Sequence, residues 1–377
     1  MKPALETYPS PSIAIACGGT GGHFCPGLAV GEALRRRGWE VTLLISPKEV
    51  DQAGARAATG MKVETLPASA FSSGRRFAFL TGSIKSYFAV RKLFAARPPA
   101  AVLAMGGFTS APPVLAAWRS GARTFLHESN SIPGRANRLL SRRVDRAFVG
   151  FPGAATQLST TSVTITGTPV RSQFRPQPPG QARTTLGLDP RRPVLLVMGG
   201  SQGASRLNDR MMECLPTLIS LAPDLQFIHL TGASDLDKVR TRYSELKRRA
   251  LVQEFSPRMD LVLGAATAAV SRAGASSLAE LAAMRLPAVL VPLPTSADNH
   301  QFHNARAFER NGAALLLEQK NASPGTLARM ICRLLGSGRP HDNMCAALAH
   351  WHKPRAADDI AEAIVQAVAP ASGKGAV

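Results

Sequence analysis

A glycine-rich turn that occurs twice, each time between a predicted strand and a predicted helix, is the feature that most constrains this chain. The apolar run Ser12–Cys17 leads into Gly18-Gly19-Thr20-Gly21-Gly22, and Val194–Met198 leads into Gly199-Gly200-Ser201-Gln202-Gly203. Such a turn lets the backbone approach a phosphate closely, while the N–H groups and dipole of the following helix favour negative charge. The repeat therefore predicts two nucleotide-type folds in tandem, with ligands outside the carboxyl ends of the strands.

Short apolar runs alternate with amphipathic stretches along both halves, which indicates parallel strand–helix–strand units. In the first half we expect strands at Ser12–Cys17, Glu40–Ser46, Lys62–Leu66, Ala101–Met105, Thr124–His127, Arg146–Val149 and Val163–Thr166. The helices of this half are expected at Pro26–Arg37, Ile84–Ala95, Pro112–Ser120 and Pro133–Ser141. In the second half we expect strands, each followed by a helix, at Val194–Met198, Gln226–Leu230, Val252–Phe255, Ala269–Ser271 and Ala288–Pro292. The predicted fold class is α/β, with two Rossmann-like domains that each contain a doubly wound parallel sheet.

The same pattern sets the expected domain boundaries. Residues 1–172 form the N-terminal domain and residues 193–354 the C-terminal domain. Residues 173–192 are rich in Pro, Gly, Gln and Arg and lose the periodicity, as an interdomain linker does. Residues 355–377 are expected to form a helix that crosses back to the N-terminal domain, followed by a frayed tail.

Basic residues outnumber acidic residues by 45 to 25, a net charge of +20, and residues 1–175 hold 22 of the basic and 8 of the acidic residues. Such a field attracts polyanions, which include nucleic acid, an anionic membrane surface and phosphorylated substrates. Charge alone does not choose among them. Because the sequence has no apolar run of about 18 residues and no secretion signal, we expect a soluble, cytoplasmic protein. The cysteines form no CxxC pair, which argues against a disulfide framework or a zinc site.

Two cofactor classes are disfavoured. A dinucleotide-binding dehydrogenase needs an acidic residue at the tip of its second strand, and here that strand ends Leu43-Leu44-Ile45-Ser46. An Asp-x-Asp pair that could hold a metal, Asp235-Leu236-Asp237, begins a charged helix instead of following a glycine loop, so we assign it to helix capping. His300 and His303 lack a third ligand at metal spacing. We therefore expect neither a metal nor a cofactor.

Polar segments follow further strands of the first half. Gly106–Pro112 follows one strand and His127–Gly134 follows the next, so both are expected at the carboxyl edge of the sheet. Within the second segment, Asn130 either faces a ligand or caps a helix. These segments extend the predicted site beyond the first glycine-rich turn.

The second half has its own polar segments at the corresponding edge. Ser271–Glu280 is a strand end, a glycine turn and a helix start whose N-terminus suits a departing diphosphate. Glu280 accepts hydrogen bonds from two ribose hydroxyls, or only complements the helix dipole. Pro292–Gln301 offers Asp, Asn and Gln side chains suited to sugar hydroxyls.

With these motifs in view, the chain resembles the MurG family of peptidoglycan glycosyltransferases from about residue 12 to residue 365. The shared motifs, in the family's order, are GGTGGHFCPGLAV, GGFTSAP, HESNSIPGRANR, GTPVR, GGSQGA, SRAGASSLAEL and ADNHQ with NA after it. The resemblance implies the GT-B architecture, two domains facing a central cleft, a donor held mainly by the C-terminal domain and no bound metal. It also implies an inverting transfer of N-acetylglucosamine from UDP-N-acetylglucosamine to the C4 hydroxyl of undecaprenyl-diphospho-N-acetylmuramoyl-pentapeptide.

Motif by motif, the resemblance also implies site residues. It places at the donor Thr20, Gly21, Gly22, Asn130, Arg171, Ser201, Ser256, Ala275, Ser276, Ser277, Leu278, Ala279, Glu280 and Gln301. Arg171 and Ser256 rest on resemblance alone, although a cation near a diphosphate gives Arg171 a physical reason. His23 follows the first glycine-rich turn and is the candidate general base or acceptor-orienting group, because histidine titrates near neutrality. Glu128 is the alternative base.

An acceptor linked to a membrane lipid requires docking, so we expect a peripheral protein at the cytoplasmic face of the inner membrane. Aromatic residues alternate with cations in one segment of the basic half, as in a peripheral membrane patch. The residues of this segment are Phe71, Arg75, Arg76, Phe77, Phe79, Leu80, Lys85, Phe88, Arg91 and Lys92. A buried helix with a solvated basic face is the alternative.

Other functions stay open on the sequence. Another GT-B glycosyltransferase, acting on a lipid or natural-product acceptor, has the same fold, and so does a sugar epimerase. A non-catalytic polyanion-binding protein fits the charge, but it has no need of paired glycine loops or of Glu280. The expected partners are UDP-N-acetylglucosamine, the lipid-linked acceptor, an anionic membrane surface and further cell-wall assembly proteins, with no nucleic acid.

Overall fold

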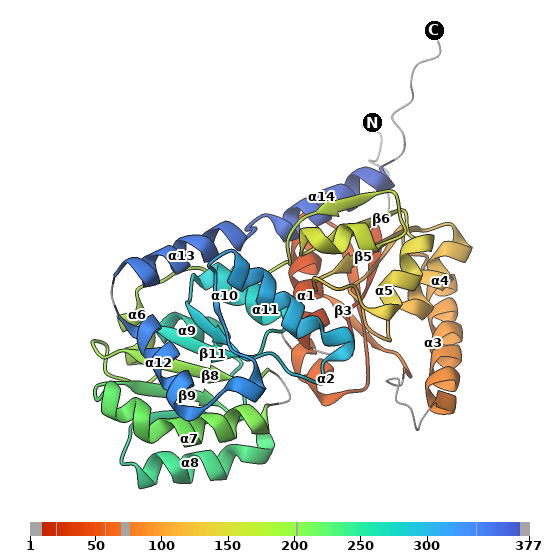
Figure 1. The fold of residues 1–377 in the computed structure, drawn as a ribbon. Helices are drawn as coiled ribbons and strands as arrows, with labels where there is room; N and C mark the ends of the chain where they lie inside the picture. Colours follow the sequence, from red (N-terminus) through yellow and green to blue (C-terminus); the bar gives the residue numbers. More distant parts are fainter. Residues whose placement is uncertain are drawn as a thin grey trace, which may run out of the picture. The chain divides into compact units, whose positions relative to one another are not determined.

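The structure is a computed structural model that describes residues 10–19, 21–56, 58–68, 76–200, 203–336 and 338–369. It divides into two compact units. Unit 1 contains the described residues of Met1–Ser129, Pro133–Pro169 and Arg355–Val377, and unit 2 contains those of Asn130–Ile132 and Val170–Pro354. Each unit contains one parallel sheet (Figure 1), which confirms the predicted fold class.

Seven parallel strands form the sheet of unit 1, in the order β3-β2-β1-β4-β5-β6-β7. Their bounds are β1 (Ser12–Ala16), β2 (Glu40–Ile45), β3 (Lys62–Thr65), β4 (Ala101–Ala104), β5 (Arg123–Glu128), β6 (Arg146–Val149) and β7 (Val163–Ile165). The chain runs outward from β1 to β3 and then from β4 to β7, so the strand order reverses between β1 and β4. The loops after these two strands therefore leave the carboxyl edge side by side, which is where ligands of such sheets bind.

Helices cover both faces of this sheet. They are α1 (Gly21–Arg36), α2 (Glu49–Ala55), α3 (Arg76–Ala96), α4 (Ala111–Ser120), α5 (Arg135–Leu140) and α14 (Ala356–Val368), with short 3-10 turns at η2 (Ser141–Arg143) and η3 (Pro152–Gln157). Because successive side chains of a strand point to opposite faces, β1 contributes to two cores. Ile13 and Ile15 pack with α1 and α14, whereas Ala14 and Ala16 pack with α3 and α4. The end of the chain thus completes the core of unit 1.

Six parallel strands form the sheet of unit 2, in the order β10-β9-β8-β11-β12-β13. Their bounds are β8 (Val194–Met198), β9 (Gln226–Leu230), β10 (Ala250–Gln253), β11 (Ala268–Ser271), β12 (Ala288–Leu290) and β13 (Leu315–Leu316). Here the strand order reverses between β8 and β11. The loops that follow these two strands carry the second glycine-rich turn and the start of α10.

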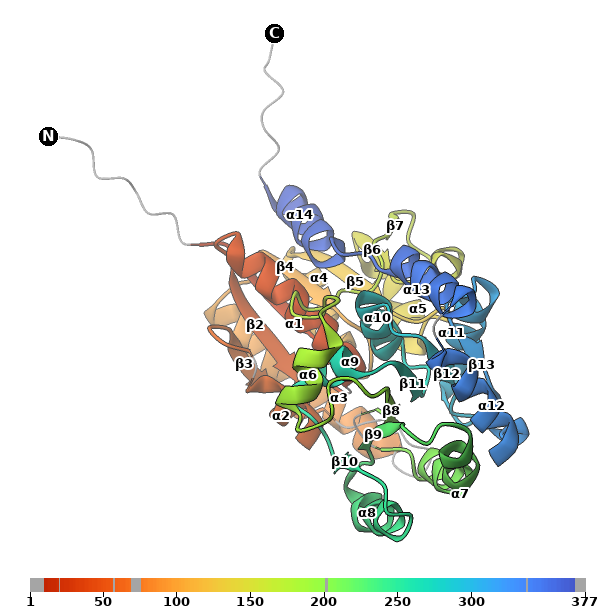
Figure 2. The ribbon, with the colours of Figure 1, turned by 90° about the vertical axis from the view of Figure 1, so that its left-hand side faces the viewer.

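Most helices of unit 2 pack in pairs. They are α6 (Pro179–Thr185), α7 (Ser205–Leu221), α8 (Leu236–Glu245), α9 (Met259–Ala265), α10 (Ala275–Met284), α11 (His300–Arg310), α12 (Pro324–Leu335) and α13 (Arg339–Trp351), with 3-10 turns at η4 (Ala233–Asp235), η5 (Ala297–Asn299) and η6 (Gln319–Asn321). Helix α7 packs against α12, α10 against α13 and α6 against α9 (Figure 2).

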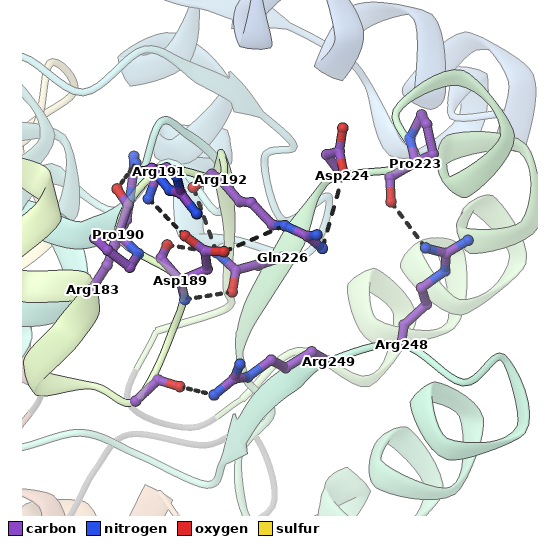
Figure 3. A network of polar contacts seen from close by, with 11 residues as sticks. Arg183, Asp189, Pro190, Arg191, Arg192, Pro223, Asp224, Gln226, Arg248 and Arg249 are labelled. Atoms are coloured by element: carbon purple, nitrogen blue, oxygen red, sulfur yellow. Dashed lines mark hydrogen bonds and ion pairs between the residues drawn. The ribbon is translucent and has the colours of Figure 1, made fainter.

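Residues 173–192, expected to form a linker, belong to unit 2 and include α6. Figure 3 shows Asp189 of this segment beside Gln226, at the start of β9. The Asp189 N–H donates to Gln226 Oε1 at 2.9 Å, and the Gln226 amide donates to the Asp189 carbonyl at 3.0 Å. The N–H of Arg191 donates to the Asp189 carboxylate, and this bond, with the arginines around it, lowers the pKa of Asp189. These contacts fasten the segment to unit 2.

The largest differences from the predicted boundaries are at the starts of α1 and α3, whereas the other predicted ends shift by at most two residues, and α2 and β13 were not predicted. Helix α1 begins at Gly21, so Pro26, the expected start, lies inside the helix, where its ring removes one backbone hydrogen bond. Helix α3 begins well before Ile84, the expected start. The prediction missed its first turns because they carry exposed apolar residues that break the amphipathic pattern. Strand β10 ends before Phe255, whose side chain is 58% exposed. An apolar residue near a strand end was therefore a poor guide to burial.

Candidate functional site

The turn after β1 in unit 1 is held by a carboxylate of the protein itself. The N–H of Gly19 donates to Oδ2 of Asp51 at 2.6 Å, and the N–H and hydroxyl of Ser46 donate to the same oxygen. Asp51, on α2, is fully buried. The ammonium of Lys48 donates to the Gly19 carbonyl at 3.0 Å. The Gly19 N–H is therefore bound within unit 1, and the prediction that this turn presents backbone donors to a phosphate rests on its other residues.

His23, the third residue of α1, packs against the turn after β4. Gly106 and Gly107 have φ values of 103° and 76°, and a Cβ added to either would lie 3.1 Å from the His23 ring. Glycine is therefore the residue that allows the imidazole this close approach. Thr109 joins the same turn to the first loop, because its hydroxyl donates to the Gly18 carbonyl at 2.7 Å. The half-buried His23 thus lies where the loops after β1 and β4 meet.

Glu128, the alternative base, ends β5 and is 3% exposed. Its Oε2 accepts hydrogen bonds from the Gly134 N–H at 2.9 Å and from Nδ2 of Asn137 at 3.0 Å. Asn137 also lies against the turn after β4, since its Nδ2 is 3.3 Å from a Cβ added at Gly106. The structure therefore brings His23 and Glu128 to the same end of the unit 1 sheet. Asn137, which binds Glu128 and lies beside Gly106, was not identified from the sequence.

His127, the residue before Glu128, has a structural role. Its Nε2 lies 3.0 Å from the Gly167 carbonyl and its Nδ1 lies 3.2 Å from the Ser129 hydroxyl. Since a carbonyl only accepts, Nε2 carries the proton and the Ser129 hydroxyl donates to Nδ1. Burial lowers the pKa of His127 to about 4, and the hydrogen bond to Gly167 opposes this shift. The ring is therefore neutral at physiological pH.

In unit 2, α10 begins after β11 with Gly274 at its N-cap position. Its first turn holds no acidic residue, so no side chain of that turn neutralises the positive end of the helix dipole. The predicted donor residues on the first turns of this helix are Ala275, Ser276, Ser277, Leu278 and Ala279. The two serines are half-buried, whereas Ala275 and Leu278 are buried. The helix start therefore presents small and hydroxyl side chains, which suit an anionic ligand.

Glu280, also on α10, is electrostatically linked to Arg171. Burial raises the pKa of the Glu280 carboxyl to about 7, and the positive charge of Arg171 opposes this shift. The Arg171 guanidinium lies over Phe174, with Cζ 5.4 Å from the ring centroid. Its buried Nε has no hydrogen-bond partner within the described part of the chain. Because a buried N–H without a partner is costly, this position fits an acceptor supplied by a ligand.

Gln301 joins the loops after β11 and β12. Its Oε1 accepts hydrogen bonds from the N–H groups of Ala273 at 3.3 Å and Leu293 at 3.0 Å. Asn304, one turn later on α11, binds the same residue, since its Nδ2 donates to the Ala273 carbonyl at 3.2 Å. That Nδ2 also donates to Oδ1 of Asn130 at 3.0 Å. Asn130, Gln301 and the loop before α10 thus form one hydrogen-bonded cluster within unit 2.

Sequence reasoning missed two residues that organise this cluster. Asn304 is fully buried, and its Oδ1 accepts hydrogen bonds from the N–H and hydroxyl of Ser131 at 2.8 and 2.9 Å. Arg272 is 5% exposed and donates to the carbonyls of Val291 and Pro292, and burial lowers its pKa to about 10. The available signal for Asn304 was a polar residue on the inner face of an amphipathic helix. Arg272 gave no signal beyond its place after a strand.

The other predicted donor residues lie elsewhere. Thr20 and Ser201 fall outside the described residues, and Gly21 and Gly22 are the first two residues of α1. Ser256 is 5% exposed and its hydroxyl accepts from the Arg258 N–H at 3.2 Å. It follows β10, at the edge of the sheet, whereas α10 follows β11 near its middle. Apart from Ser256, the described candidate residues thus fall into a unit 1 group around His23 and a unit 2 group around α10.

The Asp-x-Asp pair is only partly as predicted. Asp235 occupies the N-cap position of α8, but its side chain forms no capping hydrogen bond. Its carboxylate instead accepts a hydrogen bond from Nδ2 of Asn208, a buried residue of α7, at 2.8 Å. The Asp237 side chain is 97% exposed. Across the described ranges, no group of three or more His, Cys, Asp or Glu side chains is arranged to hold a metal ion.

Unit 2 also has a surface pocket of about 460 Å³. Its lining residues are Arg206, Asp209, Arg210, Glu213, Pro294, Gln319 and Lys320. Asp209 pairs with Lys238 at 2.6 Å, and Glu213 pairs with Arg210 at 2.7 Å. The carboxylates of Asp209 and Glu213 are thus paired with neighbouring cations. We therefore keep the candidate site of unit 2 at the start of α10.

Helix α3 carries an exposed apolar stripe. It consists of Phe77, Leu80, Ile84 and Phe88, which are 80%, 56%, 48% and 60% exposed. Their spacing of three or four residues places them on one face of the helix. Phe79 is half-buried, and the exposed cations of the helix are Lys85, Arg91 and Lys92. Phe71, Arg75 and the side chain of Arg76 fall outside the described residues. No described helix, α3 included, is long and apolar enough to cross a membrane.

Comparison with protein families identifies the class of this chain. The glycosyltransferase family 28 N-terminal domain matches residues 13–149, and the family 28 C-terminal domain matches residues 194–360. The second sheet and all of the first sheet except Ser12 and β7 lie within these ranges. The chain is therefore a glycosyltransferase with the GT-B architecture.

Individual relatives identify the family of glycosyltransferases to which the chain belongs. A curated relative from Synechococcus elongatus, named UDP-N-acetylglucosamine--N-acetylmuramyl-(pentapeptide) pyrophosphoryl-undecaprenol N-acetylglucosamine transferase, is 36% identical over 359 residues, which cover 93% of this chain and 97% of the relative. Because this identity extends over nearly the whole of both chains, the present chain belongs to that family, the MurG family.

Solved structures agree in fold. The crystal structure of Acinetobacter baumannii MurG has a TM-score of 0.72 at 24% identity and covers 95% of this chain and 100% of that chain. The crystal structure of a UDP-N-acetylglucosamine 2-epimerase has a TM-score of 0.69 at 12% identity and covers 95% and 96%. Both likenesses show the fold alone, so the fold does not separate a transferase from an epimerase. The sequence relationship does.

Proposed function

We propose that the chain transfers N-acetylglucosamine from UDP-N-acetylglucosamine to the C4 hydroxyl of undecaprenyl-diphospho-N-acetylmuramoyl-pentapeptide, with inversion and a β-1,4 link. The name of its curated relative supports this donor and this acceptor. The observation that carries the proposal within the chain is the start of α10, which lacks an acidic residue and lies in the same unit as Glu280 and Arg171. A uridine diphosphate leaving group presents a diphosphate and a ribose, which are complementary to these groups.

On this proposal, unit 2 binds the donor. The ionised Glu280 carboxylate accepts hydrogen bonds from the two ribose hydroxyls. The diphosphate lies at the start of α10 and at the turn Gly199–Gly203, and the Nε of Arg171 donates to it. Gln301 and Asn130, which the Asn304 cluster holds in place, contact the sugar. Positive charge from the guanidinium and the helix dipole meets the charge of the leaving group, so we propose that the transfer needs no bound metal.

Unit 1 supplies the proposed general base. The oxygen of the acceptor C4 hydroxyl bonds to the anomeric carbon of the donor sugar as the bond from that carbon to the diphosphate oxygen breaks. The hydroxyl proton passes to the His23 imidazole. Glu128 is the weaker candidate, because its Oε2 already accepts two hydrogen bonds. We therefore assign Glu128 to holding the loop that follows β5.

The test is UDP release from UDP-N-acetylglucosamine, with and without the lipid-linked muramyl-pentapeptide and with UDP-glucose as the control donor. Release that depends on both the acceptor and the acetamido donor supports the proposal. Release with a different lipid or natural-product acceptor moves the function to another GT-B transferase. Conversion of the donor sugar with no acceptor present would indicate an epimerase. Absence of any nucleotide-sugar binding would overturn the donor site.

We further propose that unit 1 docks at the cytoplasmic face of the inner membrane as a peripheral protein. The exposed stripe of α3 supports this, because four apolar side chains with cations nearby suit insertion among anionic lipid headgroups. Tyr87 on α3 and Arg119 on α4 brace the two helices, with the guanidinium donating to the tyrosine hydroxyl at 2.9 Å. A rigid helix pair presents the stripe at a lower entropic cost than a mobile segment.

A further inference from the structure

A chain of buried hydrogen bonds runs through unit 2 from α8, across β9, to α7. The Tyr243 hydroxyl lies 3.3 Å from Nδ1 of His229, and Nε2 of His229 lies 3.1 Å from Oδ1 of Asn208. Nδ2 of Asn208 then donates to Oδ2 of Asp235 at 2.8 Å and to the carbonyl of Thr231 at 3.0 Å. All five residues are buried. None of these residues has a role in the proposed reaction.

The direction of every bond in this chain follows from the Asn208 amide. Its Nδ2 must donate to the Asp235 carboxylate, so its Oδ1 accepts, and Nε2 of His229 therefore carries the proton. Nδ1 is then the acceptor for the Tyr243 hydroxyl. Burial lowers the pKa of His229 to about 3, so the ring stays neutral at physiological pH. The chain consequently has a single arrangement of donors and acceptors.

The end of this chain supports the second glycine-rich turn. A Cβ added at Gly203 would lie 2.6 Å from the Thr231 carbonyl oxygen and 3.0 Å from Cα of Gly232. Gly203 has a φ of 73°, and its N–H donates to the Gly200 carbonyl at 3.0 Å. The Thr231 carbonyl is therefore bound by Asn208 and, at the same time, packed against Gly203. A shift of this carbonyl would move Gly203 and the amino end of α7 with it.

We propose that Asn208 and His229 are positioning residues, which fix the Thr231–Gly232 turn and through it set Gly203 and the amino end of α7 for the diphosphate of the donor. This inference rests on the proposed function, because it takes the second glycine-rich turn as a diphosphate site. The physical reason is that a fully satisfied buried network has one low-energy geometry and makes the groups bonded to it rigid. An apolar core at the same place would fill the volume without fixing the carbonyl.

The test compares UDP with UMP, since only UDP carries the second phosphate. Asn208→Asp is nearly isosteric, but it replaces the Nδ2 donor by an oxygen that faces the Thr231 carbonyl and Asp235. We expect it to weaken UDP binding by about tenfold or more and UMP binding by less than about threefold, since one lost charge-assisted contact is worth about this much. In the double variant Asn208→Asp with Asp235→Asn, the amide at position 235 can donate to the carboxylate at position 208, but the Thr231 carbonyl still has no donor, so the loss of UDP affinity should remain.

Gln226→Leu is the matched control. Gln226 is a buried amide at the amino end of the same strand, bonded to Asp189, so its loss lowers stability without reaching the carboxyl edge. We expect it to change UDP and UMP binding by less than about twofold. Gly203→Ala disturbs the same contact without altering the polar network, and it should reproduce the selective loss of UDP even where Asn208→Asp is too unstable to purify.

Each outcome decides the inference. A selective loss of UDP in Asn208→Asp that persists in the double variant supports it, and so does the same selective loss in Gly203→Ala. Return of UDP affinity in the double variant would mean that the bond between residues 208 and 235, and not the Thr231 carbonyl, sets the turn, and it overturns the inference. Equal loss of UDP and UMP, or a similar loss in Gln226→Leu, would mean a general structural role and overturns it. Wild-type protein that binds UDP, together with a Gly203→Ala variant that binds it equally well, overturns this inference alone. Wild-type protein that binds neither nucleotide overturns the proposed function as well.

Discussion

The backbone N–H of Gly19 lies 2.6 Å from Oδ2 of Asp51, a fully buried carboxylate on α2. At the corresponding turn of unit 2, the N–H of Gly203 bonds instead to the carbonyl of Gly200. Two turns with similar sequences are therefore held in different ways. The first is held by a buried side-chain carboxyl from α2, whereas the described residues of the second close on their own backbone.

Asp51→Ala should lower the free energy of unfolding by about 2–5 kcal/mol, because it leaves the buried N–H groups of Gly19 and Ser46 without their acceptor. Urea unfolding at neutral pH measures this. Glu49→Ala, at an exposed position of the same helix, is the control and should cost less than about 1 kcal/mol. A similar cost for both variants would contradict the anchoring role.

Asn304→Ala should cost about 2–4 kcal/mol of unfolding free energy, since the N–H of Ser131 and the carbonyl of Ala273 both lose a buried partner. Denaturant unfolding again gives the value. Asn311→Ala removes one amide bond, to the Ala307 carbonyl, at the exposed end of the same helix, and should cost less than about 1 kcal/mol. Equal costs would show that the cluster around Asn304 adds no stability.

Glu280 predicts a pH dependence of stability. Its pKa in the folded protein, about 7, is above the ordinary value of 4.5, so the folded state binds a proton that the unfolded state releases. The stability contributed by the protonated form is complete below pH 4.5 and is lost as the pH rises toward 7. The stability of wild type relative to Glu280→Gln should therefore fall between pH 5 and pH 8.

Unfolding curves at several pH values check this, with Glu254→Gln as the exposed control from the same unit. The difference between wild type and Glu254→Gln should stay constant over the same range. If the Glu280→Gln difference is equally constant, burial does not raise the pKa of Glu280.

The α3 stripe predicts membrane binding. Phe77→Ser combined with Phe88→Ser removes two side chains that are 80% and 60% exposed, each worth about 1.5–3 kcal/mol when inserted in lipid. Binding to vesicles that contain phosphatidylglycerol should weaken by more than about tenfold, measured by co-sedimentation. Phe255→Ser, with 58% exposure in unit 2, is the control and should leave binding unchanged. Undiminished binding of the double variant would remove the docking assignment.

His23→Ala should reduce turnover by roughly 10² to 10⁴, the usual contribution of general base catalysis. Steady-state kinetics with the lipid-linked acceptor measure this. His303→Ala, an exposed histidine on α11, should leave turnover unchanged. A loss of less than about tenfold in His23→Ala would exclude the base role. Glu128→Gln then becomes the variant to measure.

Local sequence patterns predicted every strand of the first sheet and all of the second sheet except β13, because a parallel strand buried on both faces requires a short apolar run and a crossover helix after it. Strand β13 was missed because it has only two residues. These patterns also located the start of α10, where a glycine turn leads from β11 into a helix. The predicted boundaries were wrong where apolar residues are exposed instead of buried. Phe255 is exposed, and the early turns of α3 carry exposed apolar residues. The segment 173–192 lacks periodicity but is held by side-chain bonds to β9.

The sequence by itself determined the α/β class, the paired glycine-rich turns and the membership of the glycosyltransferase family, since these depend on residue order along short segments. Only the tertiary structure decided which polar groups meet. Asp51 and Gly19, Asn304 and Asn130, and His229 and Asn208 are each distant in sequence, and their distances depend on how strands and helices pack. A hydrogen bond requires a separation of about 3 Å and a suitable angle, and composition carries no information about either.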